Sequence, residues 1–159
     1  MIWPFSTSNY SIFVVCTANI CRSPAAEALL RHHLSQQGLS RRVSVASVGV
    51  AVSAEGQAPD PRMKKLCAEV GVSMRGIRST SANSELLQSA SEIWVMDNSH
   101  LTVLGDLVID TGATPELFDP NGKEIEDPFF DSAVAVRRVF EAIYKISEER
   151  VHKLASRAI

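Results

Sequence analysis

Hydrophobic and polar positions along this chain form blocks that predict strands and helices in alternation. Residues 12–15 are an unbroken apolar run of mostly β-branched type, which is typical of a buried parallel strand. Similar runs predict strands at residues 43–46, at 92–96 and, more weakly, at 114–118. Strands that alternate with helical patterns favour an open parallel sheet.

The helices are predicted from their start and stop residues. Pro24 fits the first turn of a helix, Ser23 before it is a candidate N-cap, and Gly38 can end the helix. Pro61 opens a second helix that stops at Gly71. Together these signals indicate two helices that connect the first three strands.

Three more helices are expected in the second half of the chain. Asn83 or Ser84 can cap a short helix over residues 85–87, and another short helix is predicted around 100–104. A long amphipathic helix fills residues 131–155. Its apolar positions recur at spacings of three and four: Val136, Val139, Phe140, Ile143 and Ile146.

These elements predict a single three-layer α/β domain over residues 11–159, with an open four-stranded parallel sheet and helices on both faces. The chain of 159 residues is long enough for one full core. Residues 1–10 are expected to be a loosely held N-terminal extension. Sites in such sheets lie beyond the carboxyl ends of the strands, so the loop after the first strand is the candidate site.

That loop, residues 16–23, brings a cysteine, an arginine and a helix start together. Backbone amides beside a helix N-terminus bind anions, and the Arg22 guanidinium can hold two phosphate oxygens. The same positive surroundings favour a thiolate at Cys16, the nucleophilic form. A cysteine that ends a buried strand is often a plain packing residue, but the arginine and the Ser-Pro pair favour a catalytic phosphate loop.

The segment Cys16-Thr17-Ala18-Asn19-Ile20-Cys21-Arg22-Ser23-Pro24 resembles the active-site signature of the low-molecular-weight protein tyrosine phosphatases. Further segments are similar to that family in the same order: Ser47-Val48-Gly49, Pro59-Asp60-Pro61-Arg62, Val95-Met96-Asp97 and Asp127-Pro128-Phe129-Phe130. The resemblance implies hydrolysis of phosphotyrosine through a cysteinyl-phosphate intermediate, with no metal and no other cofactor.

The resemblance also implies a role for each matching residue. Cys16 is the expected nucleophile, and Arg22 the expected phosphate-binding side chain. The phosphate-binding loop comprises Thr17, Ala18, Asn19, Ile20, Cys21, Arg22 and Ser23. Asn19, Ser23 and Ser47 are expected to support this loop through hydrogen bonds. The expected cleft walls are Phe129, Phe130 and Ser53.

A phosphatase of this kind needs a carboxyl group that protonates the leaving oxygen and later activates water. Three Asp-Pro pairs compete for this role, at Asp60, Asp119 and Asp127. Asp-Pro is a common turn and helix-entry pair, so a structural role is the default for each. The family resemblance selects Asp127, because the catalytic Asp-Pro there precedes the last helix and two aromatic residues.

Several positions depart from the family pattern. Ala18 replaces a usual glycine, so Asn19 is the candidate for left-handed backbone geometry. Ile77 stands where a supporting histidine is common. Ile20 favours a phosphotyrosine ring, whereas related arginine phosphatases tend to carry a threonine there. Cys21 is either a partner of Cys16 in a reversible disulfide or a buried packing thiol.

Composition excludes several other classes. The net charge of −2 gives no reason to expect nucleic acid or an anionic membrane as a partner. No apolar stretch is long enough to span a membrane, and three cysteines argue against a disulfide framework. The four histidines lack metal-ligand spacing, and His32 and His33 are expected on a solvated helix surface. A cytoplasmic protein, monomeric or weakly dimeric, is expected.

Three alternatives to the tyrosine phosphatase remain. One is the related arginine phosphatase. A second is a thiol-dependent arsenate reductase, which needs further cysteines, whereas residues 77–91 contain none and Cys67 is predicted to be core. A third is a non-catalytic phosphate-binding regulatory domain. By analogy with bacterial members, the expected partner is a phosphotyrosine-containing protein, for example a tyrosine kinase of surface-polysaccharide export.

Overall fold

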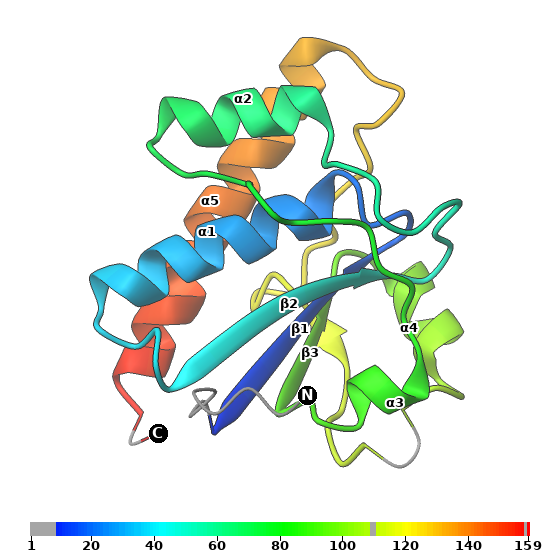
Figure 1. Cartoon of the computed structure of the whole chain (residues 1–159), viewed down its shortest axis with the longest axis vertical. Coiled ribbons are helices and arrows are strands. Elements are labelled where there is room, and N and C mark those ends of the chain that lie inside the picture. The colour runs from blue at the N-terminus through cyan, green and yellow to red at the C-terminus, as the bar shows by residue number, and fades with distance from the viewer. Residues whose placement is uncertain (1–8, 109–110, 158) are drawn as a thin grey trace.

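The computed structural model describes residues 9–108, 111–157 and 159, and a four-stranded parallel sheet forms its centre (Figure 1). The strand order is β2-β1-β3-β4. The strands are β1 (Tyr10–Cys16), β2 (Val43–Gly49), β3 (Glu92–Val95) and β4 (Glu116–Leu117). The predicted open four-stranded parallel sheet is confirmed.

Helices cover both faces of this sheet, as the sequence predicts (Figure 1). On one face lie α1 (Arg22–Gln36), α2 (Pro61–Glu69) and α5 (Ala133–Ala155). The other face carries α3 (Ser84–Leu87) and α4 (Asn98–Leu104). The five helices appear in the predicted order along the chain.

The central strand β1 explains the unbroken apolar run in the sequence. It pairs with β2 along its whole length, from Tyr10 opposite Val43 to Cys16 opposite Gly49, and with β3 on its other side. Val14 faces the larger core cluster and Val15 the smaller one on the opposite face. A strand covered on both faces needs apolar side chains on both, so the pattern is continuous rather than alternating.

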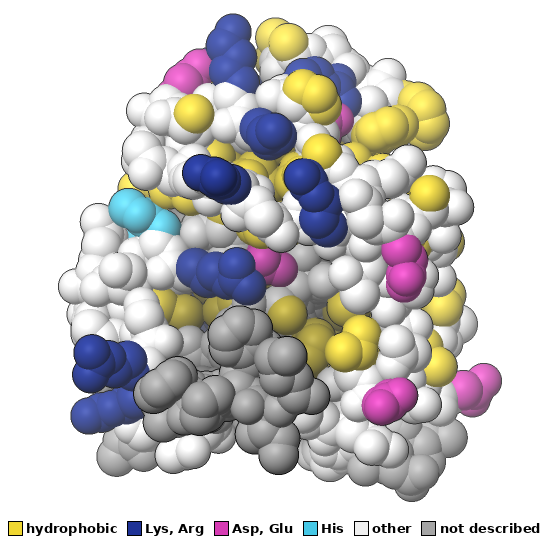
Figure 2. Space-filling view, viewed as in Figure 1, with side chains coloured by type: hydrophobic (Ala, Val, Ile, Leu, Met, Phe, Trp, Pro, Cys, Tyr) yellow, Lys and Arg dark blue, Asp and Glu magenta, His cyan; other side chains and the backbone are white. Residues whose placement is uncertain are grey.

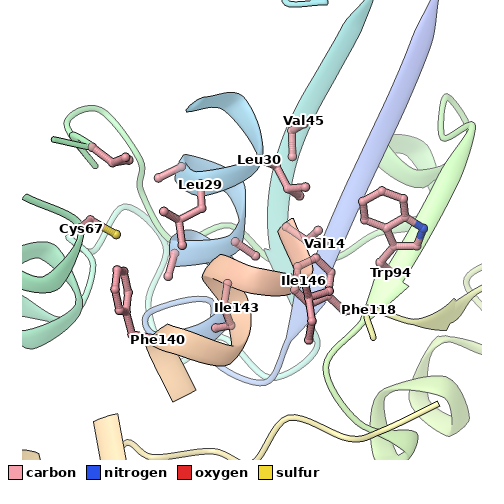
Figure 3. Close-up of a cluster of buried hydrophobic side chains, with 14 of the residues drawn as sticks. Val14, Leu29, Leu30, Val45, Cys67, Trp94, Phe118, Phe140, Ile143 and Ile146 are labelled. Carbon is pink, nitrogen blue, oxygen red and sulfur yellow. The ribbon is translucent and has the colours of Figure 1, made fainter. Parts of the chain in front are cut away.

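The larger core lies between the sheet and the helices α1, α2 and α5, and Figure 3 shows part of it. Leu29 and Leu30 of α1, Val14 of β1 and Ile143 of α5 are completely buried there. Cys67 of α2 also lies in this core, as predicted. This packing fixes the start of α1, and hence the phosphate loop, against the end of β1.

Both ends of α1 were predicted from the sequence, and one detail was wrong. The N-cap is Cys21, and Ser23 lies inside the helix with no capping bond. At the other end Gly38 has φ 69°, and the Leu39 amide donates to the Leu34 carbonyl at 2.9 Å. This closed turn ends the helix where the glycine predicts it.

Three further expectations need correction. Tyr10 already belongs to β1, so this strand begins within the segment 1–10 that was expected to be an extension. Residues 1–8 of that segment lie outside the described residues. β4 has two residues instead of the predicted five at 114–118. His33 is buried against Tyr144 of α5, with ring centroids 5.0 Å apart, because it lies on the same face of α1 as Leu29 and Leu30.

Among the described residues no helix is both long and apolar enough to cross a bilayer.

Candidate active site

The phosphate loop follows β1 directly and joins it to α1. Cys16 is the last residue of β1, and α1 begins at Arg22. Within the described part of the chain, no carbonyl or side chain accepts a hydrogen bond from the amides of residues 17–23. Unpaired amides beside a helix N-terminus form a nest for an anion. The loop therefore has the donors that bind a phosphate group.

Asn19 holds the loop in this shape. It is the one non-glycine residue of the described chain with positive φ, at 55°, and its side chain is buried. The side-chain Nδ2 of Asn19 donates to Ser23 Oγ at 2.8 Å, and its Oδ1 accepts from the Thr80 backbone amide at 2.8 Å. The predicted left-handed geometry of Asn19 is confirmed, and Ala18 does not have positive φ.

Gly49, at the end of β2, lets the loop approach the sheet. A Cβ at this position would lie 2.6 Å from the Thr17 carbonyl oxygen and 2.9 Å from the Asn19 amide nitrogen. Two flanking backbone bonds hold the loop here, from Val50 to the Cys16 carbonyl and from Ala51 to the Thr17 carbonyl. A side chain at Gly49 would push the loop away, so glycine is required by space.

Cys16 and Ser23 are hydrogen-bonded partners inside the loop, with Sγ and Oγ 2.9 Å apart. Ser23 Oγ already accepts a hydrogen bond from Asn19. Its single hydroxyl proton is therefore free to point at the sulfur or at the Val48 carbonyl, 3.4 Å away. When the sulfur is a thiolate it can only accept, so Ser23 is placed to stabilise it.

Arg22 is held in place by groups from two distant parts of the chain. Only 2% of it is exposed. Its Nη1 donates to Asp97 Oδ2 and to the Ile125 carbonyl, both at 2.8 Å. Its Nη2 donates to Thr17 Oγ1 at 3.3 Å and lies 3.6 Å from Asp127 Oδ2. The guanidinium is therefore oriented before any phosphate binds.

Asp97 and His100 were not predicted as site residues, yet they complete this network. Asp97 caps α4, and His100 Nδ1 accepts the Asp97 amide at 3.2 Å. This leaves the proton on Nε2, which lies 3.0 Å from Thr17 Oγ1. Burial of His100, which is 0% exposed, lowers its pKa and favours this neutral form. The signal in the sequence is an aspartate at a strand end with a histidine three residues later.

Burial alone would raise the pKa of Asp97, but hydrogen bonds from Ser99 and Arg22 outweigh it and hold the pKa below its usual value. Asp97 therefore stays ionised as the partner of Arg22.

Asp127 stands at the mouth of the cleft rather than inside it. Its side chain is 47% exposed, and its Oδ1 accepts the Phe129 amide at 3.1 Å. The cleft has a volume of about 230 Å³ and is lined by Cys16, Arg22 and Asp127, together with the rest of the site: Thr17, Ala18, Ile20, Cys21, Ser53, Phe129 and Phe130. The structure thus brings the three residues expected to be catalytic to one cavity.

The two phenylalanines form one side of this cavity. Their rings lie edge to face with centroids 4.8 Å apart. Phe130 is 94% exposed and Phe129 is 40% exposed, which is unusual for such large apolar groups. Ser53 is also among the lining residues. An exposed aromatic wall above an anion-binding floor suits an aryl phosphate.

Arg62 ties the segment that carries Asp127 to the start of α2. Its Nη2 donates to the Phe129 carbonyl at 2.7 Å, and its Nη1 donates to the Asp131 carbonyl at 3.1 Å. The same guanidinium makes two bonds to the Asp60 carboxylate, at 2.9 and 3.2 Å. The Asp60 amide in turn donates to the Ile20 carbonyl at 2.9 Å. Asp60 also caps α2, so its expected structural role is confirmed.

One expected supporting residue, Ser47, does not brace the phosphate loop. The Ser47 hydroxyl is buried and makes no hydrogen bond to the phosphate loop, because it lies on the Glu27 side of β2. Ile77 is buried, and the Thr80 amide provides the bond to Asn19. The Thr80 backbone amide thus supports the loop through Asn19, whereas Ser47 does not.

Cys21 is buried beside the cleft. Burial, together with the nearby Asp60, raises the pKa of its thiol to about 12, so it is protonated at neutral pH. All three cysteines are free thiols. In the described chain no group of three or more His, Cys, Asp or Glu side chains is arranged to hold a metal ion.

The fold and this loop define an α/β protein with an anion-binding cysteine loop at the end of its central strand. The chain belongs to the low molecular weight phosphotyrosine protein phosphatase family, whose model matches residues 11–158. Phosphatases are hydrolases, so this membership places the chain among the hydrolytic enzymes.

Individual relatives cover most of the chain. The low molecular weight protein-tyrosine-phosphatase Etp of Escherichia coli (strain K12) is 31% identical over 147 residues, which cover 91% of this chain and 95% of Etp. The structure of Vibrio vulnificus Wzb in complex with benzylphosphonate has a TM-score of 0.81 and 27% identity, covering 91% of this chain and 98% of that one.

The YwlE arginine phosphatase from Geobacillus stearothermophilus is also similar, with a TM-score of 0.80 and 26% identity, covering 91% of this chain and 92% of that one. Tyrosine and arginine phosphatases therefore share this fold, and the choice of substrate depends on the cleft.

Proposed function

We propose that this protein hydrolyses phosphotyrosine in proteins, with Cys16 as the nucleophile and Asp127 as the general acid and base. The observation that carries the proposal is the cleft itself: unpaired loop amides and Arg22 at its floor, and an exposed aromatic wall of Phe129 and Phe130 at its mouth. The floor suits a phosphate dianion, and the wall suits the ring to which that phosphate is attached.

In the first step the Cys16 thiolate attacks phosphorus, and the bond between phosphorus and the tyrosine oxygen breaks. The amides of residues 17–23 and the Arg22 Nη2 edge hold the equatorial oxygens. Asp127, in its acid form at the cleft mouth, gives its proton to the departing phenolate.

In the second step a water molecule attacks the phosphorus of the cysteinyl phosphate. The Asp127 carboxylate takes the proton of that water, and the bond between sulfur and phosphorus breaks. Ser23, 2.9 Å from Cys16 Sγ, donates a hydrogen bond to the thiolate as it leaves. Inorganic phosphate then departs and the starting state returns.

Ile20 and the aromatic pair favour phosphotyrosine over phosphoarginine. Both Ile20 and Phe129 line the cleft, and neither offers a polar group to a guanidino substrate. Arsenate reduction finds less support, because Cys67 is buried in the core and burial raises its thiol pKa to about 12. We propose a phosphotyrosine-bearing cytoplasmic protein as the partner, with a tyrosine kinase of polysaccharide export as one candidate by family analogy.

The test is hydrolysis of para-nitrophenyl phosphate and of matched phosphotyrosine and phosphoarginine peptides. We expect the wild type to hydrolyse para-nitrophenyl phosphate and the phosphotyrosine peptide. Cys16→Ser should hydrolyse neither of these two substrates. Asp127→Ala should lower kcat/KM for the peptide by about 10²–10⁴. Cys67→Ala is the matched control, since it removes a thiol outside the cleft. Faster turnover of phosphoarginine, or activity that survives in Cys16→Ser, would contradict the proposal.

A further inference from the structure

A second hollow, of about 460 Å³, lies between α2 and the chain that follows it, residues 71–78. Three cations line it: Lys64 of α2, and Arg75 and Arg78 of the following segment. As far as the structure describes the chain, its lining holds no aspartate or glutamate. Figure 2 shows Lys and Arg side chains gathered on this face of the molecule. We call this hollow the basic groove.

No carboxylate among the described residues pairs with the charges of the basic groove. Lys64, Arg75 and Arg78 are all exposed, and none of them forms an ion pair within the described part of the chain. The whole chain has a net charge of −2, so this concentration of positive charge is local. A hollow that gathers unpaired charge of one sign raises the local concentration of the opposite sign.

One side-chain hydrogen bond links the segment that lines the basic groove to the segment that lines the rim of the catalytic cleft. Ser53 lines the cleft, and Arg78 lines the groove. Between them, Ser79 Oγ donates to the Ala54 carbonyl at 2.7 Å, which joins the two segments. Glu55 lies beside this junction, and its carboxylate accepts a hydrogen bond from the Ser81 backbone amide at 3.0 Å. Arg78 of the groove and Ser53 of the cleft therefore each lie one residue from this bond.

We infer that the basic groove binds an acidic stretch of the protein substrate, which flanks the phosphotyrosine held in the cleft. The inference rests on the proposed phosphotyrosine hydrolysis. Carboxylates fit the arginine forks, and the bond between Ala54 and Ser79 joins the rim of the cleft to the segment that carries Arg78 and Arg75. An acidic peptide fits better than nucleic acid, because no aromatic side chain of the described residues lines the hollow for base stacking.

The test compares two phosphotyrosine peptides, one with Glu and Asp around the tyrosine and one with Gln and Asn. The variant is the triple substitution Lys64→Gln, Arg75→Gln and Arg78→Gln. We expect kcat/KM for the acidic peptide to fall by about tenfold at low salt. Values for the neutral peptide and for para-nitrophenyl phosphate should not change. About 1 M salt, where the Debye length is about 3 Å, should remove the preference of the wild type for the acidic peptide.

A second triple variant removes the same charge elsewhere: Arg41→Gln, Lys145→Gln and Lys153→Gln. None of these residues lines the groove or the cleft. An equal loss in this control would overturn the inference, since net charge alone would explain the preference. An acidic peptide that is turned over no faster than the neutral one by the wild type would also overturn it, as would equal competition by a single-stranded oligonucleotide.

Failure of the phosphatase proposal has a different signature. In that case the wild type hydrolyses neither peptide. Binding of the acidic peptide without its phosphate is then measured by fluorescence anisotropy, with the wild type and both triple variants. Weaker binding in the Lys64, Arg75 and Arg78 variant alone supports the groove, and equal binding in all three proteins overturns it.

Discussion

The two loops that meet at the cleft are built in different ways. The phosphate loop is buried and braced: Arg22 is 2% exposed, and Asn19 joins the loop to Ser23 and Thr80. The segment that carries Asp127 is open, with that side chain 47% exposed and one arginine, Arg62, holding two of its carbonyls.

This difference fits what each loop must do. Donors aimed at a phosphate act strongly only when they are oriented in advance, and burial keeps them so. A group that passes a proton to a leaving oxygen and then takes one from water needs contact with solvent. We therefore expect changes in the phosphate loop to affect binding of every phosphate, and changes around Asp127 to depend on the leaving group.

Among the variants that test this difference between the two loops, Arg22→Lys should have the largest effect. A lysine cannot bond Asp97, the Ile125 carbonyl and a phosphate oxygen at once, because it lacks the planar fork. We expect kcat/KM to fall by about 10²–10³ for good and poor leaving groups alike. Steady-state kinetics on a series of aryl phosphates measures this. The control is Arg138→Lys, which changes an arginine in an exposed ion pair with Glu126. Activity near the wild-type level in Arg22→Lys would contradict this prediction, since it would show that one positive charge suffices.

Asn19 tests how far the shape of the phosphate loop depends on one side chain. Asn19→Gly keeps positive φ but leaves the Thr80 amide without its acceptor, so the free energy of unfolding should fall by about 1–3 kcal/mol. Asn19→Ala adds a strained backbone and should cost about 1–2 kcal/mol more. Urea denaturation measures both. Equal stability of the two variants would mean that the loop relaxes out of the left-handed conformation.

Arg62→Ala tests the other loop. Without its bonds to the Phe129 and Asp131 carbonyls, Asp127 should be less well placed, and kcat/KM for poor leaving groups should fall by about tenfold. Good leaving groups need little protonation and should be spared, so the dependence of kcat/KM on leaving-group pKa should steepen.

The matched control for Arg62 is Arg137→Ala, which removes another arginine that bridges to α2, through Glu69. In the double variant Arg62→Ala and Asp127→Ala, loss of Arg62 should add nothing. A uniform loss across all leaving groups would instead assign Arg62 a purely structural role.

The smallest effect concerns Asp60, which anchors Arg62 and caps α2. Burial tends to raise the pKa of Asp60, but hydrogen bonds from Arg62 outweigh it and hold the folded pKa below its usual value. A carboxyl with a depressed pKa stabilises the fold above its unfolded pKa, and this contribution is lost as pH falls through the folded value. Asn is as good an N-cap as Asp, so Asp60→Asn keeps the cap but loses the charged partner of Arg62, which should cost about 1–2 kcal/mol at pH 7. Denaturation at pH 7 and below pH 4 should show this cost shrink on acidification, and a constant difference would contradict the assignment.

Part of this site could be predicted from local sequence, and part could not. Cys16, Arg22 and Asn19 lie within a few residues of one another, so a strand end, a loop and a helix start fix their arrangement. His33 was misplaced because a single helix pattern does not show that α5 covers it. Ser47 was expected to brace the loop, whereas its hydroxyl makes no bond there.

The sequence by itself determined the order of strands and helices along the chain, the C-terminal end of α1 and the anion-binding cysteine loop, because these follow from the chemistry of neighbouring residues. Only the tertiary structure decided which distant groups complete the site. Asp97 meets Arg22 across 75 positions and His100 meets Thr17 across 83, since the parallel order of β1 and β3 brings their carboxyl ends together. Such contacts depend on how strands pair in space, and no local pattern encodes that pairing.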